Sequence, residues 1–572
     1  MTRKAIKPWL PALLLILPLL LPAQDSGQVQ FKSVLILENG RIKPLDTFAR
    51  NLLKQFSGRS TFSGQEASVW LARVLFTPGQ TLHDRVFLIN HSDVPTALGI
   101  AGQGRQRYSF LQVEPGLAKL RQLAMQVAQL DERSRSAVDN ETWRLYVNCQ
   151  IYIRLLSACD FAPAVEPGSR EPAGDEAAVL AIVPPSEAGT EGWLSPAAFV
   201  AGPGREAAAA EVLLLQEAAQ AFRSGQDREF SRALGAFNRS VQGRLANGAA
   251  GGQVSLEIFY NGLDPFFKAQ LAYGLALLLL LLSLLVRGRL LPRLSLMLLL
   301  VGLLFHSSGL LARMVIMGRP PVTNLYETFV FVAWVCVVLG VALELAQRRA
   351  LGVMTGGIAG LLFLLVAGRY SMEGDTMGML AAVLDSNLWL ATHVATISIG
   401  YAGCVIAGII GHVQIVHRLL HPGPSPFRAL AARSLYAVLA FGLVFTFIGT
   451  VMGGIWADQS WGRFWGWDPK ENGALLIILW CAIVLHARLA GMIRELGMAA
   501  GAVVSLLTVV LAWFGVNLLG VGMHSYGFTS GIVRWLLAYI AVEIAFLAAA
   551  LYLARNRSVP RGASRGAGAE RT

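Results

Sequence analysis

The chain has 572 residues, of which 54% are hydrophobic and only 15% are charged. Soluble domains carry about 25% charged residues, so this composition excludes an ordinary soluble protein and predicts a multi-pass membrane protein. The formal net charge of +12 does not indicate nucleic-acid binding, because the basic residues cluster in short loops between apolar runs. That distribution is typical of the cytoplasmic face of membrane proteins.

Residues 1–23 begin with basic side chains and continue into a short apolar stretch. This pattern predicts a signal peptide or a signal anchor, and the sequence leaves the two alternatives open. Either one sends the residues that follow across the membrane.

Residues 24–265 are expected to form an α-rich domain outside the cytoplasm. A strand followed by a helix is expected near its start, around Asp46. Residues 114–158 and 206–245 are predicted to be helical. The stretch between them, 160–206, is rich in Pro, Gly, Ala and Glu and predicts a loose connection. The sequence does not indicate what this domain binds.

Two of the five cysteines, Cys149 and Cys159, lie in this domain. The chain has no CxxC motif, which argues against a thioredoxin-type redox pair and against a cysteine-based zinc site. If the two cysteines share one helix, they lie about 15 Å apart along it and cannot form a disulfide.

Residues 266–555 are predicted to form the membrane domain, with nine spans. The expected spans are 269–287, 292–314, 326–347, 352–368, 390–416, 433–455, 472–492, 499–519 and 531–554. Basic residues cluster in alternate loops and in the tail 556–572, so these parts are predicted to face the cytoplasm. The other loops and the preceding domain are then expected outside it. The fold class is therefore an all-α polytopic membrane protein with an α-rich extracytoplasmic domain.

An aromatic cluster lies in the predicted outer segment 456–472, "WADQSWGRFWGWDPKEN". Four of the 13 tryptophans of the chain fall within its first twelve residues. An aromatic belt at the membrane surface is one interpretation. The concentration of indole rings beside charged groups favours the other, a flat apolar platform with a polar rim that binds a large planar ligand.

The members of this platform are expected to be Trp461, Trp465 and Trp467, with Asp468 and Lys470 at the rim. If the segment is helical, Trp461 and Trp465 share one face of the helix at a spacing of four residues.

Four histidines are candidate ligands. His393 and His524 are expected on the same outer face as the tryptophans, where two imidazoles could hold a metal such as haem iron. Ordinary polar loop residues are the alternative for both. His306 and His486 fall within predicted spans, where ionisable side chains are costly and often functional. The alternative for these two is a histidine that is hydrogen-bonded between helices.

The stretch "WGRFWGWDPKENGALLIILWCAIVLH" closely resembles the WWD motif of haem-handling proteins of cytochrome c biogenesis. Three further motifs agree with this family in order: "PPVTNLYETFVFVAW", "THVATISIGYAG" and "GVGMHSYGF". Over residues 290–545 the chain is most similar to the CcsA/ResC-type subunit of System II. The segment "GRIKPLDTFARNLL" resembles an added N-terminal domain that some larger members carry.

The resemblance implies that haem b binds on the WWD loop, with its iron held by His393 and His524 as axial ligands. The tryptophans would contact the porphyrin, and from their charge Lys470 or Arg463 is expected to pair with a propionate. The family also uses histidines within the membrane; His486 matches one such position, and His306 is compared with a ligand that lies in the partner half of fused members. A histidine often found before the "PxTNLYE" motif is absent, since Arg319 precedes Pro320 and Pro321.

The implied function is to move haem to the outer face of a bacterial cytoplasmic membrane and to support its thioether ligation to CxxCH of apocytochrome c. The chain would then be a subunit of a cytochrome c synthetase, with no catalytic residue assigned. The expected partners are apocytochrome c, a Ccs1/ResB-type membrane protein and a thiol-reducing thioredoxin-like protein. A haem exporter or chaperone without ligation activity is the alternative. An electron-transfer cytochrome b fits less well, because His393 and His524 lie at the ends of spans.

Overall fold

The computed structural model describes residues 26–102, 105–131, 134–159, 179–184, 192–196, 209–245, 249–286, 288–372, 374–380, 386–515 and 532–557. The chain divides into two compact units, Met1–Asn261 and Gly262–Thr572. The predicted signal segment 1–23 lies outside the described residues. So does the predicted basic tail 556–572, except for residues 556 and 557, which end the last helix.

The first unit is mainly helical. Its helices of four or more residues are α2 (Ser26–Lys32), α3 (Leu45–Ser57), α4 (Ala67–Phe76), α5 (Pro78–Thr81), α6 (Asp93–Leu98), α7 (Phe110–Val113), α8 (Leu117–Ala128), α9 (Ala137–Ser157), α11 (Ala209–Arg223), α12 (Asp227–Arg244) and α13 (Ala249–Leu263). The expected helix over 114–158 is two helices, α8 and α9, and the second begins with a capping box at Ser136. The expected helix over 206–245 is also interrupted, at Gly225, where φ is +66°.

Three small antiparallel sheets add to these helices. They pair β1 (Leu35–Glu38) with β2 (Arg41–Pro44), β3 (Thr61–Phe62) with β4 (Gln65–Glu66), and β5 (Phe87–Ile89) with β6 (Gln106–Tyr108). The core of the unit contains a group of buried aromatic rings in which Phe56 contacts Trp70, Phe87 and Tyr152. Burial of such rings is the main favourable contribution to the stability of a domain of this kind.

The two cysteines of this unit are part of its core. Cys149 and Cys159 are both buried and both free. Burial raises the pKa of each thiol to about 12, because a thiolate would lose its hydration in the apolar interior. Thiols with so high a pKa are unreactive near neutral pH, so both cysteines are structural residues.

The second unit is a helical bundle. Its helices are α14 (Pro265–Leu282), α15 (Leu290–Met317), α16 (Leu325–Gln347), α17 (Leu351–Tyr370), α18 (Asn387–Trp389), α19 (Ala395–Leu420), α20 (Pro426–Trp461), α21 (Pro469–Leu489), α22 (Glu495–Val510) and α24 (Ile532–Arg557). Two π-helical turns, η5 (Leu390–Val394) and η6 (Leu511–Gly515), adjoin α19 and α22.

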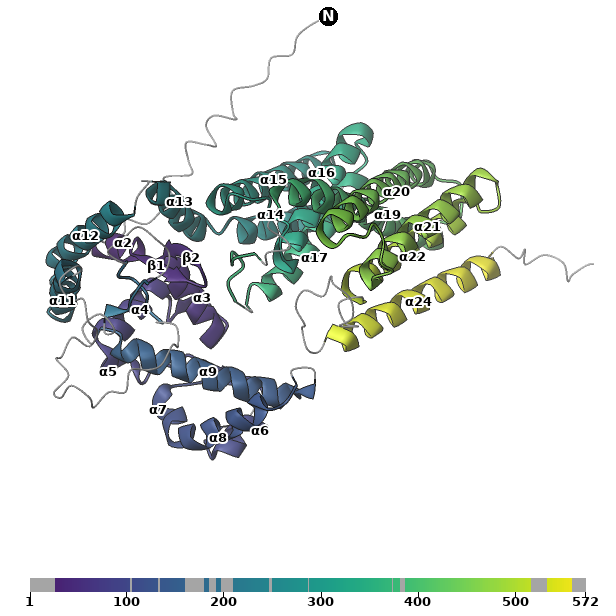
Figure 1. Ribbon diagram of the computed structural model, residues 1–572. Coiled ribbons are helices and arrows are strands. Elements are labelled where there is room, and N and C mark those ends of the chain that lie inside the picture. The colour runs from purple at the N-terminus through teal and green to yellow at the C-terminus, as the bar shows by residue number, and fades with distance from the viewer. Residues whose placement is uncertain are drawn as a thin grey trace, which may run out of the picture. The chain divides into compact units, whose positions relative to one another are not determined.

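Within the described residues, nine helices are long and apolar enough to cross a membrane. The prediction of an all-α multi-pass membrane protein is therefore confirmed. Figure 1 shows α14 to α22 packed side by side, with α24 (yellow) along one edge of the bundle. At 36 residues, α20 is about 54 Å long and exceeds the roughly 30 Å hydrocarbon core of a bilayer, so part of it extends beyond the lipid.

Candidate functional site

A cavity opens at one end of the bundle. It encloses about 1340 Å³ of empty space, its open mouth included. The first residues of α16 and α21 line it, together with η5 and the start of α19. The last turns of α20 and the π-helical turn η6 after α22 complete the walls. Aromatic side chains form much of the lining: Tyr401, Trp456, Trp461, Phe464, Trp465 and Trp513.

His393 lies at this cavity in the π-helical turn η5. Its Nδ1 lies 2.8 Å from the carbonyl oxygen of Gly449 on α20. Since a carbonyl only accepts, Nδ1 carries the hydrogen and donates, and Nε2 keeps its lone pair. Metal-ligating histidines commonly have this arrangement, in which a backbone carbonyl fixes the tautomer and the orientation of the ring. π-Helical turns are rare and are frequent at functional sites.

Two glycines of α20 allow this contact. A Cβ atom on Gly449 would lie 2.8 Å from the backbone of Ile397, so only glycine lets α20 approach α19 closely enough for its carbonyl to reach the imidazole. A Cβ atom on Gly453 would lie 2.5 Å from Cε1 of His393, so the ring occupies the space that a side chain would fill. Small residues permit such close backbone approach between membrane helices.

The tryptophan-rich segment is not one continuous helix. Helix α20 ends at Trp461, because Gly462 adopts φ +69° and caps the helix in the left-handed conformation. Helix α21 begins at Pro469 after Asp468, with a capping box in which Asp468 accepts from the backbone N–H of Lys470 and Glu471. Residues 462–468 therefore form a short loop between the two helices, and the acid and proline of the motif define the start of α21.

The loop is held by a second carboxylate. The Oε2 atom of Glu471 accepts from the backbone N–H groups of Gly466 at 2.8 Å and Asp468 at 3.0 Å. Asp468 is 5% exposed and is absent from the cavity lining, so its carboxylate serves the backbone of α21. Both acids thus fix the shape of the loop that carries Trp465.

The condition for Trp461 and Trp465 to share one helical face is not met, because the helix ends between them at Gly462. Both rings nevertheless line the cavity. Trp467 does not line it; its side chain is 70% exposed, its φ is +56°, and its ring lies at 88° to that of Trp465. The three rings therefore do not form one flat platform.

Lys470 brings a positive charge to the cavity wall. It lies in the first turn of α21, and its Nζ is 3.4 Å from the carbonyl oxygen of Trp513. Trp513 belongs to the second π-helical turn, η6, and its ring stacks at 4.6 Å on that of Phe329 from α16. Both π-helical turns of the bundle thus bring a side chain to the same cavity, His393 from η5 and Trp513 from η6.

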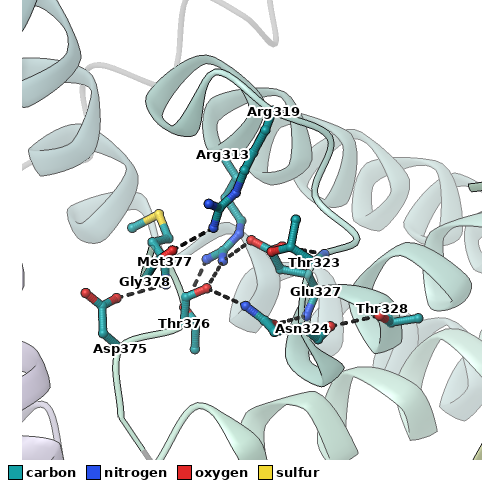
Figure 2. Close-up of polar contacts among 10 residues, drawn as sticks. All are labelled: Arg313, Arg319, Thr323, Asn324, Glu327, Thr328, Asp375, Thr376, Met377 and Gly378. Carbon is teal, nitrogen blue, oxygen red and sulfur yellow. Dashed lines mark hydrogen bonds and ion pairs between the residues drawn. The ribbon is translucent and has the colours of Figure 1, made fainter. Parts of the chain in front are cut away.

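A buried ion pair supports the wall formed by the start of α16. Nη2 of Arg313 lies 2.6 Å from Oε1 of Glu327, and both side chains are 1% exposed. Arg313 and Asn324 both donate to the carbonyl oxygen of Thr376, at 2.6 and 3.0 Å. Figure 2 shows these two contacts. Glu327 also accepts from the hydroxyl of Thr323. Because Thr323 and Asn324 line the cavity, this network positions one of its walls.

His306 and His486 are absent from the cavity lining. His306 is fully buried in α15; its Nδ1 lies 3.1 Å from the hydroxyl of Tyr273, and its Nε2 lies 3.0 Å from the carbonyl oxygen of Val330. His486 lies about 25 Å along α21 from Pro469, on an exposed face, and its Nδ1 donates to the carbonyl of Ala482. His524 lies outside the described residues.

Four aromatic residues of the lining are absent from the sequence-based site: Tyr401, Trp456, Phe464 and Trp513. Trp456 is the first tryptophan of the segment 456–472 and shares α20 with Gly453, so the segment itself pointed to it. Trp513 and Tyr401 face the cavity only because of how α22 and α19 pack, and no sequence signal identified them.

The amino-acid sequence is similar to that of known proteins, over between 37% and 85% of this chain. Residues 322–524 match the family described as Cytochrome C assembly protein. The chain is 34% identical over 221 residues to cytochrome c biogenesis protein CcsA of Chlamydomonas reinhardtii, covering 37% of this chain and 62% of that protein. It is 26% identical over 513 residues to protein NrfI of Wolinella succinogenes, covering 85% of this chain and 53% of that protein.

A third relative is covered more fully. Cytochrome c biogenesis protein CcsA of Prochlorococcus marinus, strain NATL2A, is 30% identical over 258 residues, which is 39% of this chain and 82% of that protein. The chain therefore spans less than two thirds of the first two relatives and most of the third. With this coverage and the match over residues 322–524, the chain belongs to the CcsA-type family of cytochrome c biogenesis proteins.

Proposed function

We propose that this protein acts in cytochrome c biogenesis by bringing haem to the outer face of the membrane, holding it in the cavity, and supporting its attachment to CxxCH of apocytochrome c. The observation that carries the proposal is the orientation of His393. Its Nδ1 is bound to the carbonyl of Gly449, so Nε2 is the nitrogen suited to hold iron. The names of the CcsA relatives, which refer to cytochrome c biogenesis, support the same function.

The lining of the cavity suits haem as its cargo. Haem is large, flat and apolar over its faces, with two carboxylates at one edge. Indole and phenol rings around the cavity offer flat apolar surfaces for those faces. Lys470 provides a cation for a propionate, and it lies in the first turn of α21, where the helix dipole also favours negative charge.

Further ligands are assigned from the sequence. We infer that His524 provides the second axial ligand, since it lies in the "GVGMHSYGF" motif between η6 and α24. His486 and His306 are proposed to hold haem during its passage through the membrane. His486 has an exposed ring on α21. His306 would have to give up its contact with Tyr273 or Val330 to bind iron, so His486 is the better candidate of the two.

The reaction itself needs little covalent participation by this chain. Each thioether forms when a cysteine S–H adds across a vinyl C=C of haem, which conserves electrons and releases no leaving group. The thiols must be reduced, and the iron is held in its reduced state. The protein's contribution is to fix the ring and its iron while the vinyl edge stays accessible, which raises the effective concentration of the reacting groups. The chain would thus be a subunit of a cytochrome c synthetase.

Partners and location follow from this chemistry. Apocytochrome c supplies the thiols, a thioredoxin-like protein keeps them reduced, and a Ccs1/ResB-type membrane protein completes the complex. We place the cavity on the extracytoplasmic side of a bacterial cytoplasmic membrane. The basic residues support this orientation, because Arg348, Arg349, Arg418 and Arg433 lie at the other end of α16, α19 and α20.

The test is the absorption spectrum of the purified protein beside His393→Gly, with and without added imidazole. Loss of an axial ligand is expected to lower haem occupancy about 10–100-fold, and imidazole should restore the spectrum by filling the vacated position. His83→Gly, at an exposed histidine of the first unit, is the control and should leave the spectrum unchanged. A wild-type protein without haem would sink the proposal. An unchanged spectrum in His393→Gly would move the haem to His486 or His306.

A haem exporter or chaperone is the second candidate. Co-expression with an apocytochrome that carries CxxCH separates the two functions. Covalent haem on the apocytochrome, lost in His393→Gly, supports ligation. Haem bound to this chain without any thioether product would support the exporter.

A further inference from the structure

The last helix contacts the rest of the bundle along a narrow seam. Within α24 the side chains that are at most 9% exposed are Leu536, Glu543 and Ala550, which recur every seven residues. Most of the rest of the helix is exposed; Trp535, for example, is 79% exposed. A seven-residue repeat of buried positions is the pattern of a helix that packs along one seam. The central position of this seam is an acid rather than an apolar residue.

Glu543 is bound by a histidine of α19. Its Oε2 atom lies 2.9 Å from Nε2 of His412, and the hydroxyl of Tyr539 also hydrogen-bonds its carboxylate. Nδ1 of His412 lies 2.8 Å from the carbonyl oxygen of Gly408, to which it donates. The imidazole ring is also stacked on Phe546 at 4.9 Å. Every polar atom of the imidazole therefore has a partner in this contact.

The contact can set the position of α24 along α19. Apolar helices gain little from associating within lipid, because lipid tails are as apolar as their side chains. Packing along a narrow seam of residues as small as Ala550 does little to distinguish one register from the next. A single polar residue at a seam position does distinguish them, because a shift by one turn of about 5.4 Å would leave it unpaired in an apolar environment.

The register of α24 also bears on the cavity. Its first buried residue, Leu536, lies against Gly515, which ends the π-helical turn η6; a Cβ atom on Gly515 would lie 3.8 Å from Cδ2 of Leu536. Trp513 in the same turn lines the cavity. α24 therefore packs against the turn that presents this indole ring.

We propose that the contact between His412 and Glu543 fixes the register of α24 against α19 and thereby holds in place the π-helical turn that presents Trp513 to the cavity. His412 and Glu543 are positioning residues, since neither lines the cavity. The part that concerns helix register stands independently, and the part that concerns cargo rests on the proposed function.

The register can be measured by electron paramagnetic resonance between nitroxide labels on Val416→Cys in α19 and Val533→Cys in α24. Both positions are exposed, and the five native cysteines are buried, so labels attach at the introduced sites. Wild type is expected to give one narrow distance distribution. Glu543→Leu should broaden it or shift it by about one helical turn, roughly 5 Å. Glu543→Gln keeps a side chain that hydrogen-bonds Nε2 of His412, so it should keep the narrow distribution.

Ile544→Leu is the matched control, since this neighbouring side chain is 57% exposed and faces away from the seam. The proposal is overturned if Glu543→Leu gives the wild-type distribution. It is equally overturned if Ile544→Leu broadens the distribution as much, because the effect would then not belong to the polar contact. Leucine is compatible with a membrane helix, so Glu543→Leu is expected to insert and fold, and His412→Leu provides an independent second variant.

Haem occupancy of the same preparations tests the connection to the cavity. Glu543→Leu is expected to bind at least about fivefold less haem than wild type, because it leaves a half-buried imidazole nitrogen unpaired and releases α24. Glu543→Gln should restore binding, which a general loss of structure would not allow. If no variant binds haem, including wild type, the proposed function fails while the distance measurement still decides the register. Wild-type haem occupancy in Glu543→Leu with an altered distance would overturn the connection to the cavity.

Discussion

Two regions at the cavity end of the bundle are joined by opposite kinds of contact. Between α15 and α16, the buried charges of Arg313 and Glu327 meet at 2.6 Å and also hold the backbone of Thr376. Between α19 and α20, Gly449 and Gly453 bring the backbones so close that a carbonyl oxygen reaches the ring of His393. Long charged side chains make the first contact. The second is possible because two glycines have no side chain between the helices.

The difference shows how a membrane bundle can combine a rigid cavity wall with a histidine that is oriented to bind a metal. In the first region every charge is neutralised by a neighbour, so the side chains support the wall and do not serve a ligand. In the second region Nδ1 of His393 is held by a backbone carbonyl, so the other ring nitrogen has a defined direction.

The largest effect is expected from breaking the charged contact. Arg313→Met leaves the carboxylate of Glu327 buried without its cation, which should lower the free energy of unfolding by about 3–5 kcal/mol. The double variant Arg313→Met with Glu327→Leu removes both charges and should recover much of the loss. Denaturant unfolding of the purified protein in detergent, followed by tryptophan fluorescence, measures both.

Arg232→Met is the control for that experiment. Arg232 pairs with Glu229 at 2.8 Å, but the two side chains are 70% and 53% exposed. Solvent screens such a pair, so its loss should change the free energy of unfolding by less than about 1 kcal/mol. If the single variant Arg313→Met were no less stable than the double variant, the charged contact would not be what holds this wall.

A smaller effect on stability but a large effect on binding is expected from Gly453→Ala. The added methyl group meets Cε1 of His393 at 2.5 Å, so the ring must move away from its place at the cavity. Such overpacking costs about 1–3 kcal/mol of stability. Haem affinity, read from the absorption spectrum, should fall by about 10–100-fold, the usual effect of losing the outer contacts that orient a metal ligand.

Gly274→Ala is the matched control, because no described heavy atom lies within 4 Å of a Cβ placed on Gly274 in α14. Alanine favours a helix over glycine by about 1 kcal/mol, so this variant should be at least as stable as wild type and bind haem normally. Normal haem binding by Gly453→Ala would contradict the role given to the glycine contact.

The smallest effect is expected from Trp467→Ala. Trp467 is 70% exposed and does not line the cavity, whereas Trp465, two residues earlier, does. Trp465→Ala should therefore weaken haem binding, by about fivefold if the indole contributes about 1 kcal/mol. Titration of haem into each purified variant measures its affinity and shows whether Trp465→Ala loses more than Trp467→Ala. Equal losses would mean that Trp467 turns inward when haem binds.

Sequence alone predicted the architecture of the membrane unit, because spans of this length have a strong compositional signal. It also predicted His393 and two of the indole rings at the cavity. Whether Trp461 and Trp465 share one helical face depended on a continuous helix, which the segment does not form. Gly462 and the pair Asp468-Pro469 are ordinary signals for the end of one helix and the start of the next, and they were present in the sequence.

Other features had no local signal. The π-helical turns that carry His393 and Trp513 depend on how α19 and α22 pack. The contact between Gly449 and His393 joins residues 56 positions apart in the chain, so neither spacing nor composition reveals it. The partners of His306 come from α14 and α16, which is why the sequence left open whether this histidine is a ligand or is hydrogen-bonded between helices.

The capping box at the start of α21 has a consequence for how such proteins change over evolution. Asp468, Pro469 and Glu471 specify where a helix begins, and Trp465 specifies a surface in the cavity. Loss of the indole at Trp465 leaves the start of α21 intact, whereas loss of an acid alters both the helix start and the loop that carries Trp465. A descendant that kept the acids and the proline but lost the indole would retain the architecture and change its cargo. If a relative shares the acidic residues of this segment, that is evidence of common ancestry. If it shares the tryptophans, that is better evidence of a common function.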